Sequence, residues 1–203
     1  LTPIKLGVQQ LERAWKDERP DFGERLEHFC KVAAIQIDVL SEISTDFSLI
    51  ADLGVQGLEK VELSNLLEEV VGLFQMGSLG VRWEISGFDE GVTIRGSRSH
   101  LLRVFNNLIT NSIQALSERP NKTIRIDCKA LDQGWEIIIE DNGVGISETQ
   151  VEHVFQPHFT LKKEGSGLGL TLTRSVIQQL GGSIKVSNKH PDWTTFIIWL
   201  PRA

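Results

Sequence analysis

Cysteine is scarce in this chain of 203 residues. Its two cysteines, Cys30 and Cys128, lie far apart and lack the close spacing of metal-ligating cysteines. Both stand among apolar neighbours, so we expect a buried pair that stays reduced, as in cytosolic proteins. The sequence therefore predicts neither a disulfide framework nor a zinc site.

Long apolar runs are also absent. No stretch approaches the ~20 apolar residues that a membrane-spanning helix needs. The chain starts with Leu1-Thr2-Pro3, without an initiator methionine and without the pattern of a signal peptide. We therefore expect a cytoplasmic fragment of a longer protein. The fragment itself would make no membrane contact, and a membrane anchor elsewhere in the parent protein stays open.

Positive charge is in short supply, because 21 lysines and arginines stand against 27 aspartates and glutamates, giving a net charge of −6. A net acidic chain argues against nucleic acid or an anionic membrane as the main partner. The rest of the composition is ordinary, with 40% hydrophobic residues and 18 glycines. These values exclude a disordered or collagen-like protein and favour a globular one.

The first 53 residues carry the pattern of a helical hairpin. Apolar residues of the first helix are spaced 3, 4, 3 and 4 apart, as in a coiled-coil seam: Leu1, Ile4, Val8, Leu11 and Trp15. A polar stretch from Asp17 to Gly23, which contains Pro20, ends that helix. A second helix runs to about Leu53, with a seam at Leu26, Cys30, Ala33, Ile37, Leu40, Ser44 and Phe47.

Such a hairpin cannot bury both of its apolar faces alone. A second copy of the chain is the simplest source of the missing surface, which predicts a homodimer joined in a four-helix bundle. The alternative is that the hairpin packs on its own globular domain. We divide the chain into a hairpin at residues 1–55 and a second domain at 56–203.

From Leu58 onward the pattern changes to mixed helix and strand. Alternation predicts strands at 58–63, 81–86, 92–95, 124–130, 135–140, 183–187 and 195–200. Helices are predicted at 65–76, with Ser64 as the N-cap, at 99–117 and at about 169–180. One-sided alternation means that helices cover one sheet face. The sequence thus predicts an α+β chain whose second domain is a two-layer α/β sandwich with a mostly antiparallel sheet.

Two asparagines stand one turn apart in the helix predicted at 99–117, Asn107 and Asn111. Asparagine is a middling helix former, so a pair on one helical face invites a functional interpretation. Neutral amide oxygens ligate a hard cation without adding negative charge, which suits a phosphate–Mg²⁺ group. Two exposed or capping asparagines are the alternative.

A second cluster follows an apolar strand directly, Asp141-Asn142-Gly143-Val144-Gly145-Ile146. Two glycines two apart let the backbone approach a ligand closely. A carboxylate at a strand end accepts hydrogen bonds, for example from the exocyclic amine of a base. A tight turn is the alternative, because Asn-Gly is a common turn pair.

A third cluster, Gly165-Ser166-Gly167-Leu168-Gly169-Leu170, opens the last predicted helix. Exposed N–H groups at a glycine-rich helix start bind phosphate well. The cluster does not follow a strand, which argues against a Rossmann dinucleotide site.

A further motif, Phe155-Gln156-Pro157-His158-Phe159-Thr160, stands between the second and third clusters. In chain order, the asparagine pair, the second cluster, this motif and the third cluster resemble the N, G1, F and G2 boxes of sensor histidine kinases. The resemblance covers essentially the whole chain and is to the nitrogen-regulation type. Leu1-Thr2-Pro3-Ile4 looks like the residues that follow the acceptor motif His-Glu-x-Lys-Asn-Pro in those kinases. The resemblance implies the ATP-binding fold shared with gyrase, Hsp90 and MutL, and an acceptor histidine upstream of Leu1.

The resemblance also implies ATP and Mg²⁺ as cofactors and a role for each matching residue. Asn111 would coordinate Mg²⁺, and Asn107 would lie near the phosphates. Asp141, beside Gly143 and Gly145, would accept a hydrogen bond from the adenine amino group.

The remaining matches lie around the third cluster. Its residues Gly165, Gly167, Leu168, Gly169 and Leu170 would bind the phosphates. Lys162 would reach them from a short lid as a point charge, which completes a catalytic set with Asn107 and Asn111. Trp193 departs from the pattern, because a glycine usually stands there, at the edge of the adenine pocket.

The implied activity is that of an ATP-dependent protein-histidine kinase core, which passes the phosphoryl group to a histidine and then to an aspartate of a response regulator. An ATPase clamp of the gyrase, MutL or Hsp90 kind, or a nucleotide-binding dimerisation module without catalysis, are the alternatives. The clamps carry a glutamate at the position of Asn107 as general base for water, and an amide cannot take that proton. We therefore expect the fragment to bind ATP without hydrolysing it appreciably. It should not label itself either, because the acceptor histidine is expected upstream of Leu1.

Overall fold

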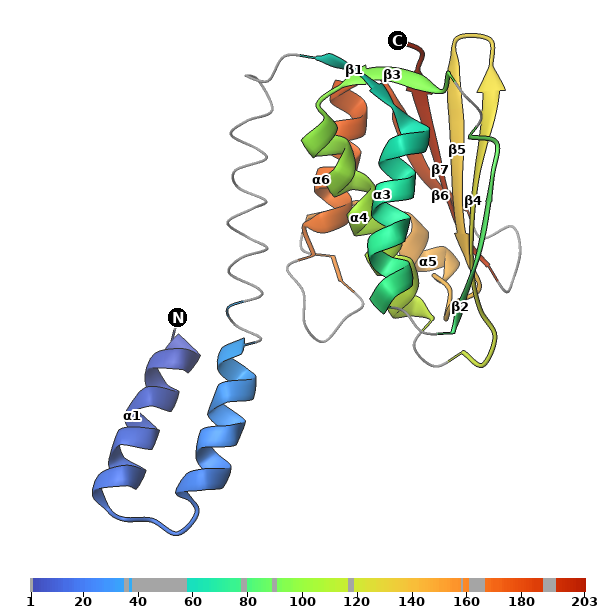
Figure 1. The fold of residues 1–203 in the computed structure, drawn as a ribbon. Coiled ribbons are helices and arrows are strands. Elements are labelled where there is room, and N and C mark those ends of the chain that lie inside the picture. Colours follow the sequence, from blue (N-terminus) through green and yellow to red (C-terminus); the bar gives the residue numbers. More distant parts are fainter. Residues whose placement is uncertain are drawn as a thin grey trace.

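The structure of the chain is a computed structural model, which describes residues 2–34, 37, 58–77, 80–88, 91–116, 119–157, 159–160, 167–187 and 193–203. It contains a helical hairpin at the N-terminus and an α/β domain from residue 58 onward (Figure 1). The hairpin and the α/β domain are described separately below. Among the described residues, no helix is long and apolar enough to cross a membrane.

The hairpin consists of α1 (Thr2–Lys16) and a second helix that begins at residue 22 and is described to residue 34. The predicted break between them is confirmed, and the rings of Trp15 and Phe22 lie 5.4 Å apart across it. Phe29 packs against α1 at Gly7, where a side chain would collide with its ring. The predicted continuation of the second helix to about Leu53 lies outside the described residues, except for Ile37.

Only part of the predicted seam is buried within one chain. Ile4 and Leu11 are half-buried, whereas Val8 is 49% and Trp15 69% exposed. Ala14 of α1 is buried, but it lies outside the predicted seam. The second helix repeats this pattern, because Leu26 is 42% and Ile37 56% exposed. Each helix thus presents one face to the other helix and leaves a second apolar face open.

The expectation of two buried cysteines is wrong for Cys30, which is exposed on the second helix of the single chain. It is confirmed for Cys128, which is buried in the α/β domain, where burial raises the pKa of its thiol to about 11. The difference has a simple cause: apolar neighbours in sequence do not reveal whether the helix face that carries them has a partner.

Five strands form the main sheet in the order β2-β4-β5-β7-β6. Their bounds are β2 (Val81–Ser86), β4 (Lys122–Leu131), β5 (Gly134–Asp141), β6 (Ser183–Ser187) and β7 (Thr194–Pro201). All neighbouring pairs are antiparallel except β2 and β4, which run parallel. The predicted mostly antiparallel sheet is therefore confirmed.

Two predicted strands stand apart from that sheet. β1 (Glu59–Glu62) and β3 (Thr93–Gly96) pair with each other in a separate antiparallel ribbon. The ribbon is tied to the main sheet by hydrogen bonds that the carbonyl of Thr93 accepts from the indole of Trp135, over 3.1 Å, and from the backbone N–H of Ala203, also over 3.1 Å.

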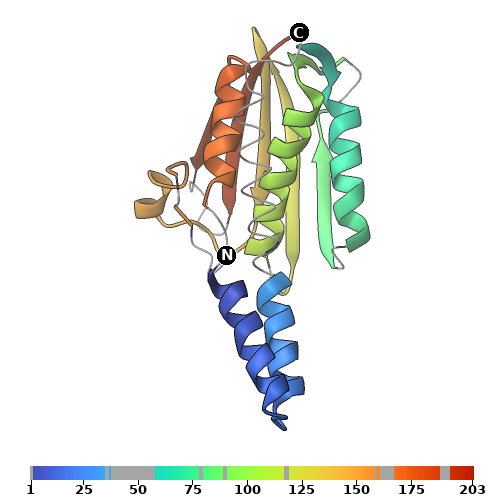
Figure 2. The ribbon, with the colours of Figure 1, turned by 90° about the vertical axis from the view of Figure 1, so that its left-hand side faces the viewer.

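Three helices cover one face of the main sheet, as predicted: α3 (Leu63–Gly77), α4 (Arg98–Ala115) and α6 (Gly169–Gln179). Figures 1 and 2 show them side by side on the same side of the strands. The buried residues of α4 recur with the helical period: Leu101, Val104, Phe105, Leu108, Ile109 and Ser112. They pack on inward-facing side chains of the sheet such as Ile126, Ile137 and Ile198.

Two local predictions need correction. Ser64 does not cap α3, because that helix begins at Leu63 and Ser64 lies inside its first turn. A short helix, α5 (Glu148–Val151), was not predicted, because four residues are too few to show a period. Its start is held by the side-chain oxygen of Gln150, which accepts a hydrogen bond from the N–H of Ser147 over 2.9 Å.

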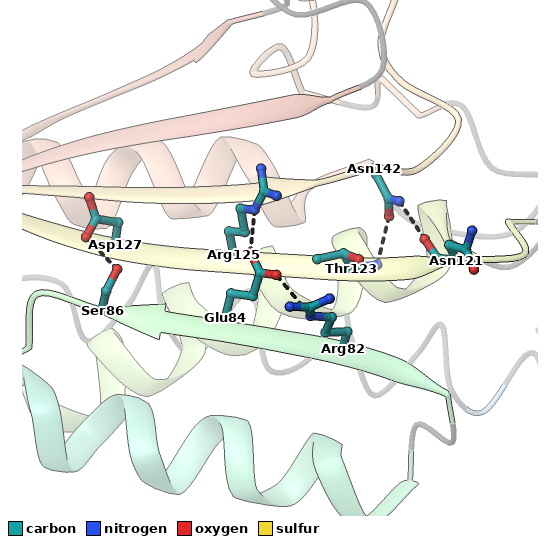
Figure 3. A network of polar contacts seen from close by, with 8 residues as sticks. All are labelled: Arg82, Glu84, Ser86, Asn121, Thr123, Arg125, Asp127 and Asn142. Atoms are coloured by element: carbon teal, nitrogen blue, oxygen red, sulfur yellow. Dashed lines mark hydrogen bonds and ion pairs between the residues drawn. The ribbon is translucent and has the colours of Figure 1, made fainter.

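The other face of the sheet carries a polar network across β2 and β4 (Figure 3). Glu84 pairs with Arg82 at 3.0 Å and with Arg125 at 2.6 Å, and the guanidinium of Arg125 lies 4.1 Å from the ring centre of Trp193. Exposed pairs of this kind add little stability. The contact between Arg125 and the ring of Trp193 places Trp193 on this open face of the sheet.

Candidate functional site

A cleft of about 320 Å³ opens between α4, the ends of β5 and β7, and the start of α6. It collects residues from all three predicted clusters: Asn107, Asn111, Asp141, Gly145, Gly167, Gly169 and Leu170. Gly143 and Leu168 stand next to lining residues. Lys162 and Gly165 lie outside the described residues. Residues far apart in sequence therefore meet at one place.

Helix α4 supplies the two asparagines, which line the cleft one turn apart. The Nδ2 group of Asn107 donates a hydrogen bond to Oγ1 of Thr173 in α6, over 2.9 Å. This bond joins the helix of the first cluster to the helix opened by the third.

Asp141 ends β5 at the floor of the cleft and is only 2% exposed. Its Oδ1 accepts a hydrogen bond from the N–H of Gly143, and its Oδ2 accepts one from the hydroxyl of Ser112, both over 3.0 Å. Burial raises the pKa of Asp141 to about 6, and these two hydrogen bonds oppose the rise. At neutral pH the floor of the cleft therefore holds a carboxylate that can accept a further hydrogen bond.

The turn after Asp141 is fixed against the end of α4. The N–H of Val144 donates to the carbonyl of Ala115 over 3.0 Å, and Arg119 donates to the carbonyl of Gly143 over 2.9 Å. A Cβ at Gly143 would collide with Ala115 and with Oδ1 of Asp141, so only glycine fits there. Gly145 has a φ of +81°, which glycine adopts without strain.

The first turn of α6 forms the opposite wall. Gly167 precedes it with a φ of +66°, and Leu168 occupies the N-cap position. A Cβ on Gly169 would lie 2.5 Å from Oδ1 of Asn107, so glycine lets the two helices approach here. The first N–H groups of any helix lack partners inside it and carry partial positive charge. This end of the cleft therefore suits an anion such as phosphate.

Several residues in or behind the cleft lining escaped the sequence interpretation. Ser112 and Thr173 hold Asp141 and Asn107 in place, and both are buried. A buried hydroxyl on an apolar helix face requires a hydrogen-bond partner, and this was the available signal. The remaining lining residues that had no predicted binding role are Gln114, Ala115, Val144, Ile146, Val154, Phe159, Thr160, Thr194 and Phe196.

The donor set fits a magnesium–nucleotide complex. Among the described residues, no three His, Cys, Asp or Glu side chains gather in a way that would hold a metal without other ligands. Mg²⁺ suits such a site, because it usually takes one or two protein oxygens and completes its shell with phosphates and water. Asn111 offers an amide oxygen, α6 a phosphate-binding end, and Asp141 an acceptor for a base.

Residues 96–203, which contain the whole cleft, match the family described as histidine kinase-, DNA gyrase B-, and HSP90-like ATPase. The chain belongs to this family. The matched region thus covers the part of the domain in which the three clusters meet.

Relatives of the chain include the sensor histidine kinase ZraS of Escherichia coli strain K12, 28% identical over 186 residues. The aligned part is 91% of this chain and 40% of ZraS, so the chain spans less than half of that relative. The catalytic domain of histidine kinase ThkA has a TM-score of 0.66 and 27% identity, over 72% of this chain and 99% of that domain.

A solved structure of ThkA in complex with the response regulator protein TrrA is similar over 99% of this chain and 58% of that chain. Its TM-score is 0.72, at 22% identity, which shows a shared fold that includes the hairpin. The predicted ATP-binding fold of the kinase, gyrase and Hsp90 type is thus confirmed.

Proposed function

We propose that this chain is the ATP-dependent core of a protein-histidine kinase in a two-component system. The observation that carries the proposal is the identity and setting of Asn107. It lines the cleft, and its Nδ2 group donates a hydrogen bond to Thr173. An ATPase clamp needs a general base at this point, and an amide cannot accept the proton of an attacking water.

The cleft residues that match the kinase motifs each have a defined role in this proposal. Asp141 accepts a hydrogen bond from the 6-amino group of adenine, and Asn111 contributes its oxygen to Mg²⁺. The N–H groups at the start of α6, from Gly167 to Leu170, hold the phosphates. Lys162 and Gly165 keep their expected roles at the phosphates as predictions, because they lie outside the described residues.

The reaction is phosphoryl transfer by positioning and charge neutralisation. Mg²⁺, when bound, neutralises the phosphate oxygens. The cleft holds the γ-phosphorus in line with an imidazole nitrogen of the acceptor histidine. An N–P bond forms, the bond from phosphorus to the bridging oxygen of ADP breaks, and the imidazole releases its N–H proton. We place the acceptor histidine N-terminal to Leu1, at the start of the hairpin.

Partners follow from the same proposal. The open faces of the hairpin, with Val8 and Trp15 exposed, favour a homodimer through a four-helix bundle. A response-regulator receiver domain would take the phosphoryl group from the histidine onto an aspartate, and the ThkA complex supports a partner of this class. We further propose the nitrogen-regulation subtype and a cytoplasmic location, where ATP is supplied.

Radiolabel transfer from γ-labelled ATP tests the proposal. A chain extended N-terminally to include the acceptor histidine should become labelled, with the alkali-stable and acid-labile product of a phosphoramidate. The chain from Leu1 should bind ATP without becoming labelled. Asn111→Ala or Asp141→Ala in the extended chain should abolish labelling while circular dichroism shows an unchanged fold.

Two outcomes favour the alternatives. Fast steady-state release of phosphate by the 203-residue chain supports the ATPase clamp. ATP binding without any labelling of the extended chain supports a silent nucleotide-binding module.

A further inference from the structure

One end of the Asn107 carboxamide is bonded to α6, and the other end lies close to the first residue of the same helix. Its Nδ2 donates to Oγ1 of Thr173 over 2.9 Å, and its Oδ1 lies so close to Gly169 that a Cβ there would stand 2.5 Å away. Thr173 is only 3% exposed, so water competes little for its hydroxyl. The bond joins α4 to α6, and the two bonded residues lie 66 positions apart in sequence.

We propose that Thr173 is a positioning residue that fixes the polarity of the Asn107 amide. A carboxamide has an oxygen end and an NH₂ end of nearly equal size, and the hydrogen-bond partner of one end decides which end is left for a ligand. With Nδ2 engaged by Thr173, Asn107 offers its oxygen to the cleft. The inference deepens the proposed function and rests on it.

This polarity has a chemical consequence. An amide oxygen attracts Mg²⁺ or a water molecule in its shell, and it repels the oxygens of a phosphate that carries no metal. Asn107 would therefore favour the magnesium complex of the nucleotide over the free nucleotide. Thr173 would act on this preference only through Asn107.

A plain packing role for Thr173 makes a different prediction. Packing depends on the volume of the side chain, whereas orientation of Asn107 depends on the hydroxyl. Thr173→Val keeps the volume and removes the hydroxyl, while Thr173→Ser keeps the hydroxyl and removes a methyl group. Ser175→Ala is the matched control, because the Ser175 hydroxyl donates to the Thr171 carbonyl of its own helix, over 3.1 Å.

Calorimetry on the 203-residue chain separates the two roles. In one titration ATP is added in the presence of a chelator. In a second titration, without chelator, Mg²⁺ is added to the ATP-saturated protein. Thr173→Val should raise the Mg²⁺ concentration at half-saturation about five- to tenfold, the scale of one lost hydrogen bond. It should leave metal-free ATP affinity unchanged or raise it up to about twofold, because the amide is then free to turn its oxygen away from the phosphates, and Thr173→Ser and Ser175→Ala should stay near wild type in both titrations.

A second readout needs neither nucleotide nor metal. In ¹H–¹⁵N spectra, the side-chain NH₂ hydrogens of Asn107 should be protected from solvent exchange in the wild type and in Thr173→Ser. They should exchange faster in Thr173→Val, because their acceptor is gone. Ser175→Ala should leave them protected.

The proposal is overturned if Thr173→Ser is as damaging as Thr173→Val, or if Thr173→Val weakens ATP binding equally with and without Mg²⁺. Unchanged Asn107 signals in Thr173→Val would also overturn it, even though ATP binds. Absence of ATP binding by the wild type contradicts instead the proposed function and, with it, the role of the Asn107 oxygen. The nucleotide-free spectra then still report whether Thr173 holds Asn107.

Discussion

The hydroxyl of Ser112 donates a hydrogen bond to Oδ2 of Asp141 over 3.0 Å, which joins α4 to the end of β5. Both side chains are buried, at 1% and 2% exposure. Ser112 directly follows Asn111, so one turn of α4 holds the buried carboxylate and also carries the proposed metal ligand. The base end and the phosphate end of the cleft are therefore fixed by the same helix.

Asp141→Asn should stabilise the ligand-free protein at high pH. Burial raises the pKa of Asp141 from 3.8 in the unfolded chain to about 6 in the folded protein. The protonated carboxyl therefore favours the folded state. This contribution to stability is complete below pH 3.8 and is lost as the pH rises through about 6. A rise from 3.8 to about 6 corresponds to about 3 kcal/mol at pH 8, a cost that asparagine avoids.

Thermal melts at several pH values check this expectation. The advantage of Asp141→Asn over wild type should be small near pH 4 and grow up to about pH 7. Ser112→Ala serves as the opposite control, because it removes a donor to the carboxylate and should destabilise most at high pH. An advantage of Asp141→Asn that does not change with pH contradicts the assignment of the shifted carboxyl.

Nucleotide binding should distinguish adenine from guanine. The Asp141 carboxylate accepts from the 6-amino group of adenine and repels the 6-oxo group of guanine. Asp141→Asn should lower the affinity for ATP by about 1–3 kcal/mol, the scale of a mismatched buried polar partner. Calorimetric titration with ATP and GTP analogues measures both, and equal affinities in the wild type would rule out this role for Asp141.

The affinity for adenine nucleotide should also fall as the pH drops through about 6, because protonation removes the acceptor. The nucleotide phosphates titrate in the same range. Asp141→Asn is therefore measured in parallel, and its weaker binding shows the phosphate contribution alone. A wild-type profile parallel to that of Asp141→Asn argues against a protonation effect at the cleft floor.

The chain should form dimers through the hairpin. Val8 and Trp15 are 49% and 69% exposed in one chain, and a second hairpin would cover them. Val8→Glu with Trp15→Glu should raise the dimer dissociation constant at least about a hundredfold, because charge is buried at an apolar interface. Gln9→Glu on the same helix adds charge without removing apolar surface and should leave the dimer intact.

Light scattering gives the mass of each variant. A wild-type monomer at micromolar concentration is incompatible with the four-helix bundle. Removal of residues 1–55 should leave a folded monomer that still binds nucleotide, and a dimer of that shortened chain would place the interface in the α/β domain.

The two cysteines should differ sharply in thiol reactivity. Burial raises the pKa of Cys128 to about 11, so almost no thiolate exists at neutral pH, whereas Cys30 is exposed in the single chain. Mass spectrometry after a short pulse of alkylating reagent on the monomeric variant with Val8→Glu and Trp15→Glu should find label on Cys30 and none on Cys128 until the protein unfolds, whereas the four-helix bundle of the wild-type dimer should slow the labelling of Cys30. Cys128 labelling in the native protein would show that the sheet opens there.

Periodicity in the sequence predicted most elements of the α/β domain. Alternation at 81–86 and 135–140 and the apolar spacing of α4 each report which residues share a face, and this is a local property. The order of the three clusters in the chain likewise pointed to the nucleotide cleft. Ser64 was assigned as a cap because its residue type favours that position, although the backbone begins the helix one residue earlier.

By itself, the sequence determined the helical hairpin, the strands and helices of the second domain, and the glycine, asparagine and aspartate motifs that line the cleft. Only the tertiary structure decided which surfaces meet. It set the β1–β3 ribbon apart from the main sheet, left Cys30 exposed, and paired Ser112 with Asp141 and Thr173 with Asn107. These partners lie 29 and 66 positions apart, and a local period encodes which face a residue occupies but carries no information about the element that packs against it.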